Sequence, residues 1–550
     1  MTILQGTADV NAIEAPVTIK GYLLCAFAAF GGIFFGYDSG YINGVLGSQV
    51  FIDAVQGKGA TAISSSHTSL IVSILSAGTT VGSLLAGDLA DRMGRRPTII
   101  SGCGIYAAGV VIQMFAASSL ATIVVGRFLA GIGVGFVTAV IVLFMSEIAP
   151  RKVRGALLSC YQFCTTIGLM LGAIVDNYTE GRNDSGAYRI PIGIQFAWAI
   201  ILATGLFLLP DSPRYYVKRG KLDKARDTLV RLRGQPPTSH FIEIELAEIV
   251  ANAEYEARMI PTRGWFSSYA ACFSGSLFDA GSNVRRTILG TSLQMMQQWT
   301  GVNFVFYFST PFLQSTGAVK NVFMTSLAFT IVNVGSTPLS FWTIERFGRR
   351  ALLIWGALGM LICQFIVAII GVTVGFNKTH DVNGSPIADN VPAVNAQVAF
   401  IAIYIFFFAS TWGPAAWVMV GEIFPLPIRS RGVALSTSSN WLWNTIISVI
   451  TPYMVGKDKG NLRSSVFFIW GGLCTCACVY AYFLVPETKG LSLEQVDQML
   501  SETNPRNSAK WRPTTTFAAE AGKVAGSNKH VEVAVEDEKL AHEDGAMQHV

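Results

Sequence analysis

The chain has 550 residues, of which 51% are hydrophobic and only 14% are charged, whereas roughly 25% of the residues of a soluble domain are charged. This composition excludes an ordinary soluble domain and favours a membrane protein. The net charge of +5 does not indicate nucleic-acid binding, because the basic residues lie in loops between apolar segments. The nine cysteines are dispersed without zinc spacing, so neither a metal site nor a cofactor is expected.

Apolar runs dominate the chain, and twelve of them are long enough to cross a hydrocarbon core of about 30 Å. We therefore expect an all-α membrane protein of twelve transmembrane helices. The spans are predicted near residues 20–44, 68–90, 97–116, 121–146, 155–175, 191–209, 286–313, 321–344, 351–375, 396–421, 432–455 and 465–485. The first run has no small-residue cleavage site after a short apolar core, which favours a retained helix over a signal peptide.

Polar segments divide these spans into two sets of six. The expected order is a cytosolic N-terminal tail, a six-helix half, a cytosolic linker with short helices, a second six-helix half and a largely disordered cytosolic tail. The corresponding ranges are 1–19, 20–209, 210–285, 286–485 and 486–550. Charged residues at helical spacing predict two to four short amphipathic helices in the linker, with a flexible linker as the alternative. The acidic, polar end of the chain is typical of disorder.

Charged motifs recur in the two halves. Residues 88–96 are echoed by 345–350, and residues 146–155 are echoed by 421–432. The Pro-Asp-Ser at 210–212 is echoed by the Pro-Glu-Thr at 486–488. Charged motifs at corresponding places of a hydrophobic chain indicate two homologous halves, an architecture found in many secondary transporters.

Lys and Arg cluster on one side of the predicted bundle. The connections that follow even-numbered spans carry groups such as Arg92, Arg95 and Arg96, whereas the other connections are poorer in basic residues. The positive-inside rule therefore places both termini in the cytoplasm.

Acidic residues accompany these arginines in both halves. We expect Glu147 to pair with an arginine of the partner cluster across the interface between the halves, and Glu422 likewise. The expected charge network comprises Arg92, Glu147, Arg154, Glu345, Arg346, Glu422 and Arg431. Exposed pairs contribute only about 0–1 kcal/mol each, but a network can bias two states that differ by a few kcal/mol. Positive-inside topology alone explains the arginines but not the repeated glutamates.

Taken together, several motifs resemble the sugar porter family of the major facilitator superfamily over about residues 20–495. The motifs are the two Gly-Arg-Arg sequences, Gly126-Arg127-Phe128, and residues 210–214, 297–303 and 486–490. Each is weak alone, but their order is specific, and residues 300–303 with the cytosolic insert look most like fungal hexose transporters. The resemblance implies the major facilitator fold, a plasma-membrane location, a monomer, and a charge network that latches the outward-facing state.

Amide and aromatic side chains inside the predicted bundle suit a sugar. Amides both donate and accept hydrogen bonds, and an aromatic ring can cover the apolar face of a pyranose. By resemblance, the sugar-contacting positions are Gln162, Gln297, Gln298, Asn303, Asn333, Trp417 and Asn440. Gln297 and Asn303 would lie about 9 Å apart along a regular helix, unless the helix unwinds at Gly301. The alternative is that buried amides hold helices together.

Gly413 and Pro414 predict a break in the tenth span, because proline removes a backbone hydrogen bond and glycine allows a bend. The resemblance implies that this break is a gate hinge. Many relatives carry a second Gly-Pro pair preceded by Glu, and that Glu is absent here. The inner edge of this gate is therefore expected to differ.

Asp38 lies inside the first apolar run. A carboxylate in a membrane should be protonated or paired, and Arg127 in the fourth span is the expected partner. An acid beside a fixed cation can change protonation when substrate arrives, as proton coupling requires. The resemblance implies an acid here in proton-coupled members and commonly Asn in passive carriers, although many fungal facilitators keep Asp. A structural Asp–Arg pair is the alternative.

The sequence thus predicts import of a monosaccharide, glucose or another hexose, together with protons by alternating access. The expected partners are the sugar, protons and the lipid bilayer. A passive hexose facilitator and a transport-inactive glucose sensor are the alternatives, although such sensors usually carry longer cytosolic tails. An enzyme is not expected, because the chain has no nucleophile elbow, metal cluster or phosphate loop.

Overall fold

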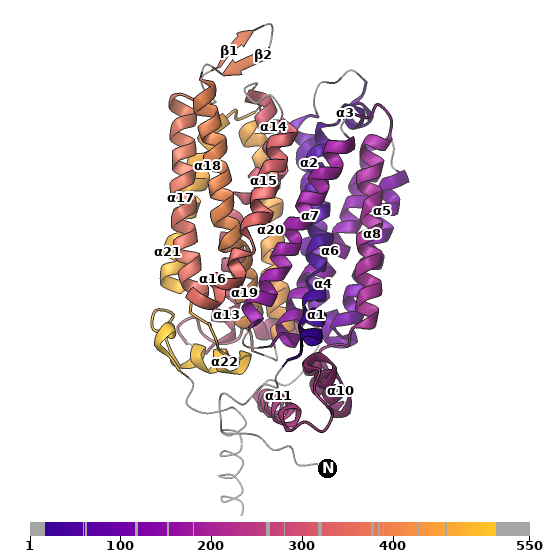
Figure 1. Cartoon of the computed structure of the whole chain (residues 1–550), viewed down its shortest axis with the longest axis vertical. Coiled ribbons are helices and arrows are strands. Elements are labelled where there is room, and N and C mark those ends of the chain that lie inside the picture. The colour runs from indigo at the N-terminus through magenta and orange to yellow at the C-terminus, as the bar shows by residue number, and fades with distance from the viewer. Residues whose placement is uncertain are drawn as a thin grey trace, which may run out of the picture.

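The computed structural model describes residues 17–512, except residues 59, 61–62, 116–118, 151–152, 180, 260–264, 280, 317–321, 376–378, 383–384, 389, 426–427 and 457–458. The described chain is almost entirely helical (Figure 1). The first 16 residues and the acidic end beyond Arg512 lie outside the described residues, and so do the expectations made for them.

The N-terminal half supplies six long segments of the bundle. They are α1 with α2 (Ile19–Ala28 and Gly31–Gly47), α4 (Ser65–Met93), α5 (Arg95–Phe115), α6 (Leu120–Ile148), α7 (Arg154–Thr179) and α8 (Gly186–Leu208). The short helix α3 (Gln49–Gln56) follows α2. The boundaries agree with the predicted spans to within a few residues.

The C-terminal half supplies the other six segments, several of them interrupted. They are α13 with α14 (Asn283–Trp299 and Val302–Thr316), α15 with α16 (Val322–Ser336 and Leu339–Phe347), α17 (Arg349–Thr373), α18 with α19 (Val391–Ser410 and Trp412–Glu422), α20 (Arg429–Val455) and α21 (Val466–Leu484). An antiparallel hairpin, β1 (Thr379–Val382) and β2 (Ser385–Ala388), joins α17 to α18. We call the end of the bundle that carries this hairpin the hairpin end.

Among the described residues, nine helices are long and apolar enough to cross a membrane, or ten if the pair α15–α16, bent by 44°, is one span. The predicted spans missing from this set are α13–α14 and α20. Both carry amides and other polar side chains, such as Gln297 in α13 and Asn440 in α20, which lower their hydropathy. They nevertheless pack inside the bundle against α4, α19 and α21, so their polarity points to an internal surface.

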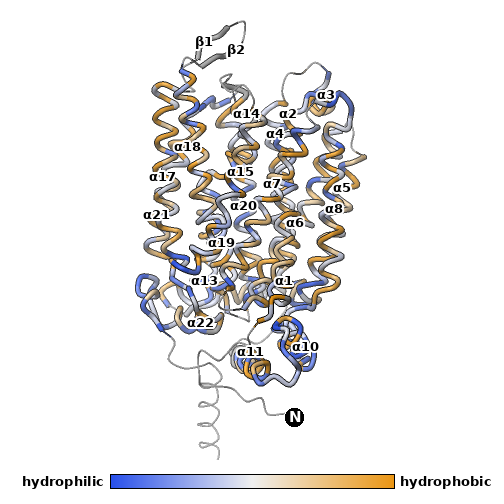
Figure 2. Tube along the Cα trace, in the orientation of Figure 1, coloured by the Kyte–Doolittle hydropathy of each residue, from blue (hydrophilic) through white to orange (hydrophobic). Residues whose placement is uncertain are grey.

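The linker folds as helices, as the charge spacing predicts. It contains α9 (Pro213–Lys218), α10 (Leu222–Arg233), α11 (His240–Met259), α12 (Trp265–Ala270) and a 3₁₀ turn at Ala271–Phe273. Helices α10 and α11 lie below the bundle and contain both hydrophilic and hydrophobic residues (Figure 2). Buried Arg233 of α10 joins these two helices to the bundle. It pairs with Glu245 of α11 at 2.6 Å and donates to the carbonyl of Ile148, at the end of α6, at 2.9 Å. We call this end of the bundle the linker end.

The sequence predicts a largely disordered tail from residue 486, but the structure has ordered elements beyond that point. Helix α22 (Leu493–Glu502) and a 3₁₀ turn at Ser508–Lys510 follow the last span. Ser492 and Gln495 form a capping box at the start of α22, which fixes its first turn. Apolar Leu493, Val496 and Met499 are buried on one face of this helix, so the segment to Arg512 is packed rather than loose.

A shared corner explains the Gly-Arg-Arg repeat. Gly94 and Gly348 adopt φ +104° and +89° before α5 and α17, a conformation that favours glycine. The Asp211 carboxylate then accepts the backbone N–H groups of Arg95 and Arg96 at 3.1 and 3.3 Å. Burial raises the pKa of Asp211, while the N–H of Ser212 and the charge of Arg95 oppose that rise.

The second half repeats this corner with Glu487, whose carboxylate accepts the N–H groups of Arg349 and Arg350 at 3.0 and 3.1 Å. Carboxylates at helix N-termini satisfy free N–H groups and favour the helix dipole. The repeated Pro-Asp-Ser and Pro-Glu-Thr motifs are therefore helix caps for the Gly-Arg-Arg corners.

Candidate functional site

A cavity lies between the two halves. Its volume is about 540 Å³ including its opening, within the roughly 300–1,000 Å³ of small-molecule pockets. All seven side chains assigned to sugar contact from the sequence line it: Gln162 from α7, Gln297 and Gln298 from α13, Asn303 from α14, Asn333 from α15, Trp417 from α19 and Asn440 from α20. The structure thus brings the whole predicted set to one place.

The sequence analysis missed other residues on the wall of this cavity. They include Phe35 and Ser39 of α2, Thr165 of α7, Tyr307 of α14 and Asn444 of α20. Asn444 follows Asn440 by one helical turn, so the spacing of the two amides was a signal that they share a face. Phe35 and Ser39 flank Asp38 in the sequence, which offered a similar signal.

Hydrogen bonds connect the amides of α13 and α20 to the break in the tenth span. Gln297 Nε2 donates to the carbonyls of Trp412 and Gly413 at 3.1 and 2.9 Å. Asn440 Nδ2 donates to Gln297 Oε1 at 2.8 Å and to Gln294 Oε1 at 2.6 Å. A ligand that rearranges these amides would therefore act directly on the start of α19.

The predicted hinge coincides with an interruption of the backbone. Helix α18 ends at Ser410, Thr411 has φ −134° and ψ −82°, and α19 begins at Trp412. Pro414 lies in the first turn of α19, where its missing N–H does least harm. Gly413 and Pro414 are therefore adjacent to the break, as expected from the sequence.

A second break lies at Gly301, which has φ +84° between α13 and α14. This interruption brings Asn303 back toward α13, where its side-chain amide donates to Gln298 Oε1. Asn444 Nδ2 donates to Tyr307 at 3.2 Å, and Ser76 of the other half donates to Asn444 Oδ1 at 2.7 Å. The span is therefore interrupted at Gly301, the condition under which Gln297 and Asn303 can reach the same cavity.

We expect Gly301→Ala to destabilise the protein. A non-glycine residue at positive φ costs about 1–3 kcal/mol, and the added Cβ would lie 2.7 Å from Trp470 Cγ. The midpoint of thermal unfolding in detergent should fall. Gly472→Ala in α21 is the control, because its Cβ meets nothing within 4 Å, and an unchanged midpoint for Gly301→Ala would contradict the role of the break.

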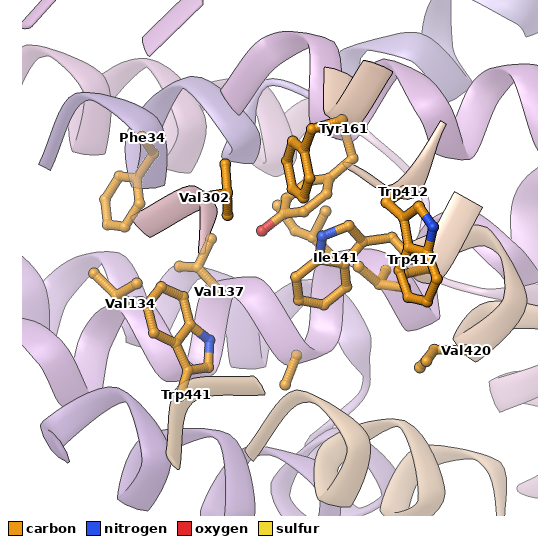
Figure 3. Close-up of a cluster of buried hydrophobic side chains, with 14 of the residues drawn as sticks. Phe34, Val134, Val137, Ile141, Tyr161, Val302, Trp412, Trp417, Val420 and Trp441 are labelled. Carbon is orange, nitrogen blue, oxygen red and sulfur yellow. The ribbon is translucent and has the colours of Figure 1, made fainter. Parts of the chain in front are cut away.

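One polar atom in the cavity wall has no partner among the described residues. Asn333 Oδ1 is buried there without a hydrogen bond to any described residue. An unsatisfied buried polar atom costs about 1–3 kcal/mol, so a hydroxylated ligand would be stabilised here. Trp417 provides an apolar wall and packs edge-on against Tyr161, with the rings 5.5 Å apart (Figure 3).

Asp38 is fully buried in α2, and it lacks the partner that the sequence predicts. Its Oδ1 accepts a hydrogen bond from Tyr106 at 3.4 Å, and its Oδ2 has no partner among the described residues. Arg127 instead donates to the carbonyl of Ile71 at 2.8 Å and to the Tyr41 hydroxyl at 2.7 Å. The described residues hold no direct Asp38–Arg127 ion pair, because the Arg127 guanidinium hydrogen-bonds α4 and Tyr41, and the role of Arg127 as the partner of Asp38 stays a prediction.

The glutamates at the linker end also pair differently from the prediction. Glu147 binds Arg95 at 2.8 Å and Glu422 binds Arg349 at 2.9 Å, so each pair lies within its own half. The start of α5 or α17 aims the arginine at the glutamate, which sequence spacing alone does not show. The expectation that these two glutamates cross the interface is therefore corrected.

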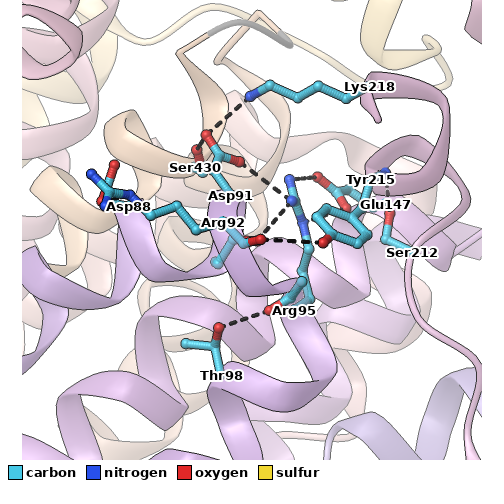
Figure 4. A network of polar contacts seen from close by, with 12 residues as sticks. Asp88, Asp91, Arg92, Arg95, Thr98, Glu147, Ser212, Tyr215, Lys218 and Ser430 are labelled. Carbon is cyan, nitrogen blue, oxygen red and sulfur yellow. Dashed lines mark hydrogen bonds and ion pairs between the residues drawn. The ribbon is translucent and has the colours of Figure 1, made fainter. Parts of the chain in front are cut away.

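Other members of the network do cross the interface. Arg431 of α20 binds Asp91 at 2.8 Å and Asp88 at 3.3 Å, both on α4. Ser430 donates to Asp91 as well, at 2.6 Å (Figure 4). In the reverse direction, Glu345 Oε1 accepts the backbone N–H of Ala156 in α7 at 3.1 Å. These contacts hold the two halves together at the linker end.

Two of the remaining predicted members contact residues of their own helices. Arg92 is 63% exposed and pairs with Asp88 of its own helix. Arg346 lies over the Trp342 ring, 4.8 Å from its centroid. Arg154 is buried at the start of α7.

We expect Arg431→Gln to open the linker end. Hydrogen bonds to charged groups contribute about 1.5–3 kcal/mol, so the open population should rise about 10- to 150-fold. Hydrogen–deuterium exchange should accelerate at the last turn of α4 and the first turn of α20, which Arg431 connects. Arg92→Gln removes an exposed pair within one helix and is the control; equal exchange in the two variants would show that Arg431 is no latch.

Comparison with known proteins agrees with this geometry. The family model described as "Sugar (and other) transporter" matches residues 24–500. The chain belongs to this family of sugar transporters. It is 42% identical to the major facilitator-type transporter ecdD of Aspergillus rugulosus, over 92% of this chain and 95% of that protein. It is 40% identical to the probable glucose transporter rco-3 of Neurospora crassa, over 93% and 84% respectively.

A solved structure shows the same fold. The proton:xylose symporter XylE, bound to 6-bromo-6-deoxy-D-glucose, matches with a TM-score of 0.73 and 23% sequence identity, over 87% of this chain and 99% of that chain. The chain described here is therefore a multi-pass membrane transporter with the major facilitator fold, as its motifs predict.

Proposed function

We propose that this transporter imports a monosaccharide of the glucose and hexose class across the plasma membrane together with protons. The observation that carries the proposal is a cavity between the halves that is lined by amides of both halves and by Trp417. Neutral amides match the mixed donors and acceptors of a sugar without demanding a charged substrate. The family and the glucose transporter among its relatives support the same substrate class.

Alternating access follows from where the contacts between the halves lie. The bonds of Arg431 to Asp88 and Asp91 join the two halves at the linker end, so they would have to break before the halves part on that side. We place the linker end in the cytosol, on the strength of the basic loops there. Sugar entering from the hairpin end would draw in Gln297, and the break at Thr411 would let α19 move against α18.

Proton coupling would run through α2. Phe35 and Ser39 line the cavity, whereas the neighbouring Asp38 faces Tyr106 of α5. Sugar binding and protonation of the Asp38 carboxyl would therefore both act on the same turn of α2, residues 35–39. A protonated Asp38 removes the cost of a buried charge and lets α2 move, whereas an ionised Asp38 resists burial.

A passive facilitator is the second candidate. The observation that favours it is the placement of Arg127, which binds Tyr41 and Ile71 rather than Asp38. A carboxyl without a cation in contact could stay protonated throughout the cycle, and the protein would then equilibrate sugar without moving protons.

The sugar specificity is tested with purified protein in liposomes. We expect saturable uptake of labelled glucose that unlabelled hexoses inhibit, while the open-chain alcohol mannitol does not. Absence of any sugar flux would contradict the proposal and would favour a sensor of the same fold.

A further inference from the structure

A groove separate from the sugar cavity opens at the linker end. It lies between the start of α13, the end of α21 and α22, and its volume is about 760 Å³ including its open mouth. Figure 1 shows α22 below α13 at this end of the bundle. Because α13 begins and α21 ends here, the groove lies where the bundle leaves the bilayer.

The walls of the groove are largely apolar. Ile288 and Leu289 of α13 face Leu484 at the end of α21 and Leu500 of α22. Ile288 is 43% exposed and Leu484 is 53% exposed, so the groove is open toward the surface that lipid covers. This exposure would be unfavourable in water but not against acyl chains.

Two arginines line the same groove. Arg286 is buried and binds Asp497 of α22, yet its Nε has no partner among the described residues. The neighbouring Arg285 is half-buried and forms no ion pair with a described residue. The single carboxylate of Asp497 thus leaves a net positive charge at the polar edge of an apolar groove.

The loop before α13 also presents apolar groups. Phe278 is 97% exposed and Leu277, which lines the groove, is 55% exposed. Aromatic and aliphatic side chains of this kind are stable when they enter the interfacial layer of a membrane. They mark the level of the headgroups next to Arg285.

We propose that this groove binds one anionic phospholipid of the cytosolic leaflet. Its phosphate lies at Arg285, next to Arg286, and an acyl chain runs along Ile288 and Leu484. Charge complementarity selects the ligand, because the cytosolic leaflet is rich in anionic lipids that attract basic residues at the interface. The apolar walls favour a lipid over a free phosphate. The assignment to the cytosolic leaflet rests on the orientation proposed above, whereas the groove and the class of its ligand do not depend on that orientation.

Thermal unfolding of the purified full-length protein tests this site. We expect phosphatidylserine in detergent micelles to raise the unfolding midpoint at a lower mole fraction than phosphatidylcholine does. Arg285→Gln should raise the mole fraction of phosphatidylserine needed for half the shift about fivefold, the effect of one basic residue near an anionic surface. Arg231→Gln, which removes an exposed arginine of α10, should leave it unchanged.

A second variant distinguishes the contribution of the apolar groove to lipid binding from that of the positive charge. Ile288→Trp places a bulky ring in the groove without altering a charge, and it should also weaken the phosphatidylserine effect. Equal responses of Arg285→Gln and Arg231→Gln would overturn the proposal. An equal midpoint shift from inorganic phosphate would overturn it as well, because the site would then bind an anion and not a lipid. Neither result bears on sugar flux, so the transport proposal is tested separately.

Discussion

Asp38→Asn should abolish uphill accumulation of sugar while leaving sugar exchange intact. A membrane potential contributes about 2.3 kcal/mol per charge per 100 mV, enough for roughly 50-fold accumulation when one proton enters with each sugar. The amide cannot take up a proton at physiological pH, so the accumulation ratio should fall to one. Labelled glucose inside vesicles at a fixed potential measures this ratio, and counterflow without a gradient measures exchange.

A matched variant shows whether the effect belongs to Asp38. Asp176 of α7 is another buried carboxylate with an oxygen unpartnered among the described residues. Its Oδ2 accepts the backbone N–H of Gly44 at 3.2 Å, and it does not line the sugar cavity. Asp176→Asn should retain accumulation. Accumulation that survives in Asp38→Asn would show that the proton is carried elsewhere or not at all.

Gln297→Ala should lower the efficiency of transport about 30- to 150-fold. The side chain donates to Trp412 and Gly413 and accepts from Asn440, so its loss leaves these groups unpaired and removes a sugar contact. A loss of about 2–3 kcal/mol is expected, and each 1.4 kcal/mol is a factor of ten. Initial uptake rates over a range of glucose concentrations give the change.

Helix packing is the competing explanation for a buried amide, and Gln397 tests it. This residue of α18 is buried and donates to the carbonyl of Val367 at 2.9 Å, away from the cavity wall. Gln397→Ala should lower thermal stability without altering the apparent affinity for sugar. If both variants lower affinity equally, Gln297 acts through packing alone.

The sequence predicts the bundle because apolar length is a direct physical signal for a membrane span. The break at Gly301 was also predictable, since glycine tolerates the positive φ found there. The bend between α15 and α16 was not anticipated, although Gly335 and Pro338 lie beside it. Helix interruptions depend on neighbouring helices that satisfy the freed backbone groups, and a single sequence does not show those neighbours.

The site was predictable in its composition but not in its pairings. Residue type and motif identified the amides of the cavity, and the structure brings them together. The sequence gives no direction for a long side chain, so Arg127 was assigned to Asp38 when it binds Tyr41. For the same reason the expected network includes Arg92 but not Arg95, the residue that binds Glu147.

Proton movement evoked by sugar tests the central claim most directly. Purified protein is placed in liposomes at a fixed internal negative potential, and the external pH is followed as glucose is added outside. The account predicts external alkalinisation that tracks glucose entry and vanishes in Asp38→Asn. Glucose entry without any proton signal would contradict it and would make this protein a passive facilitator.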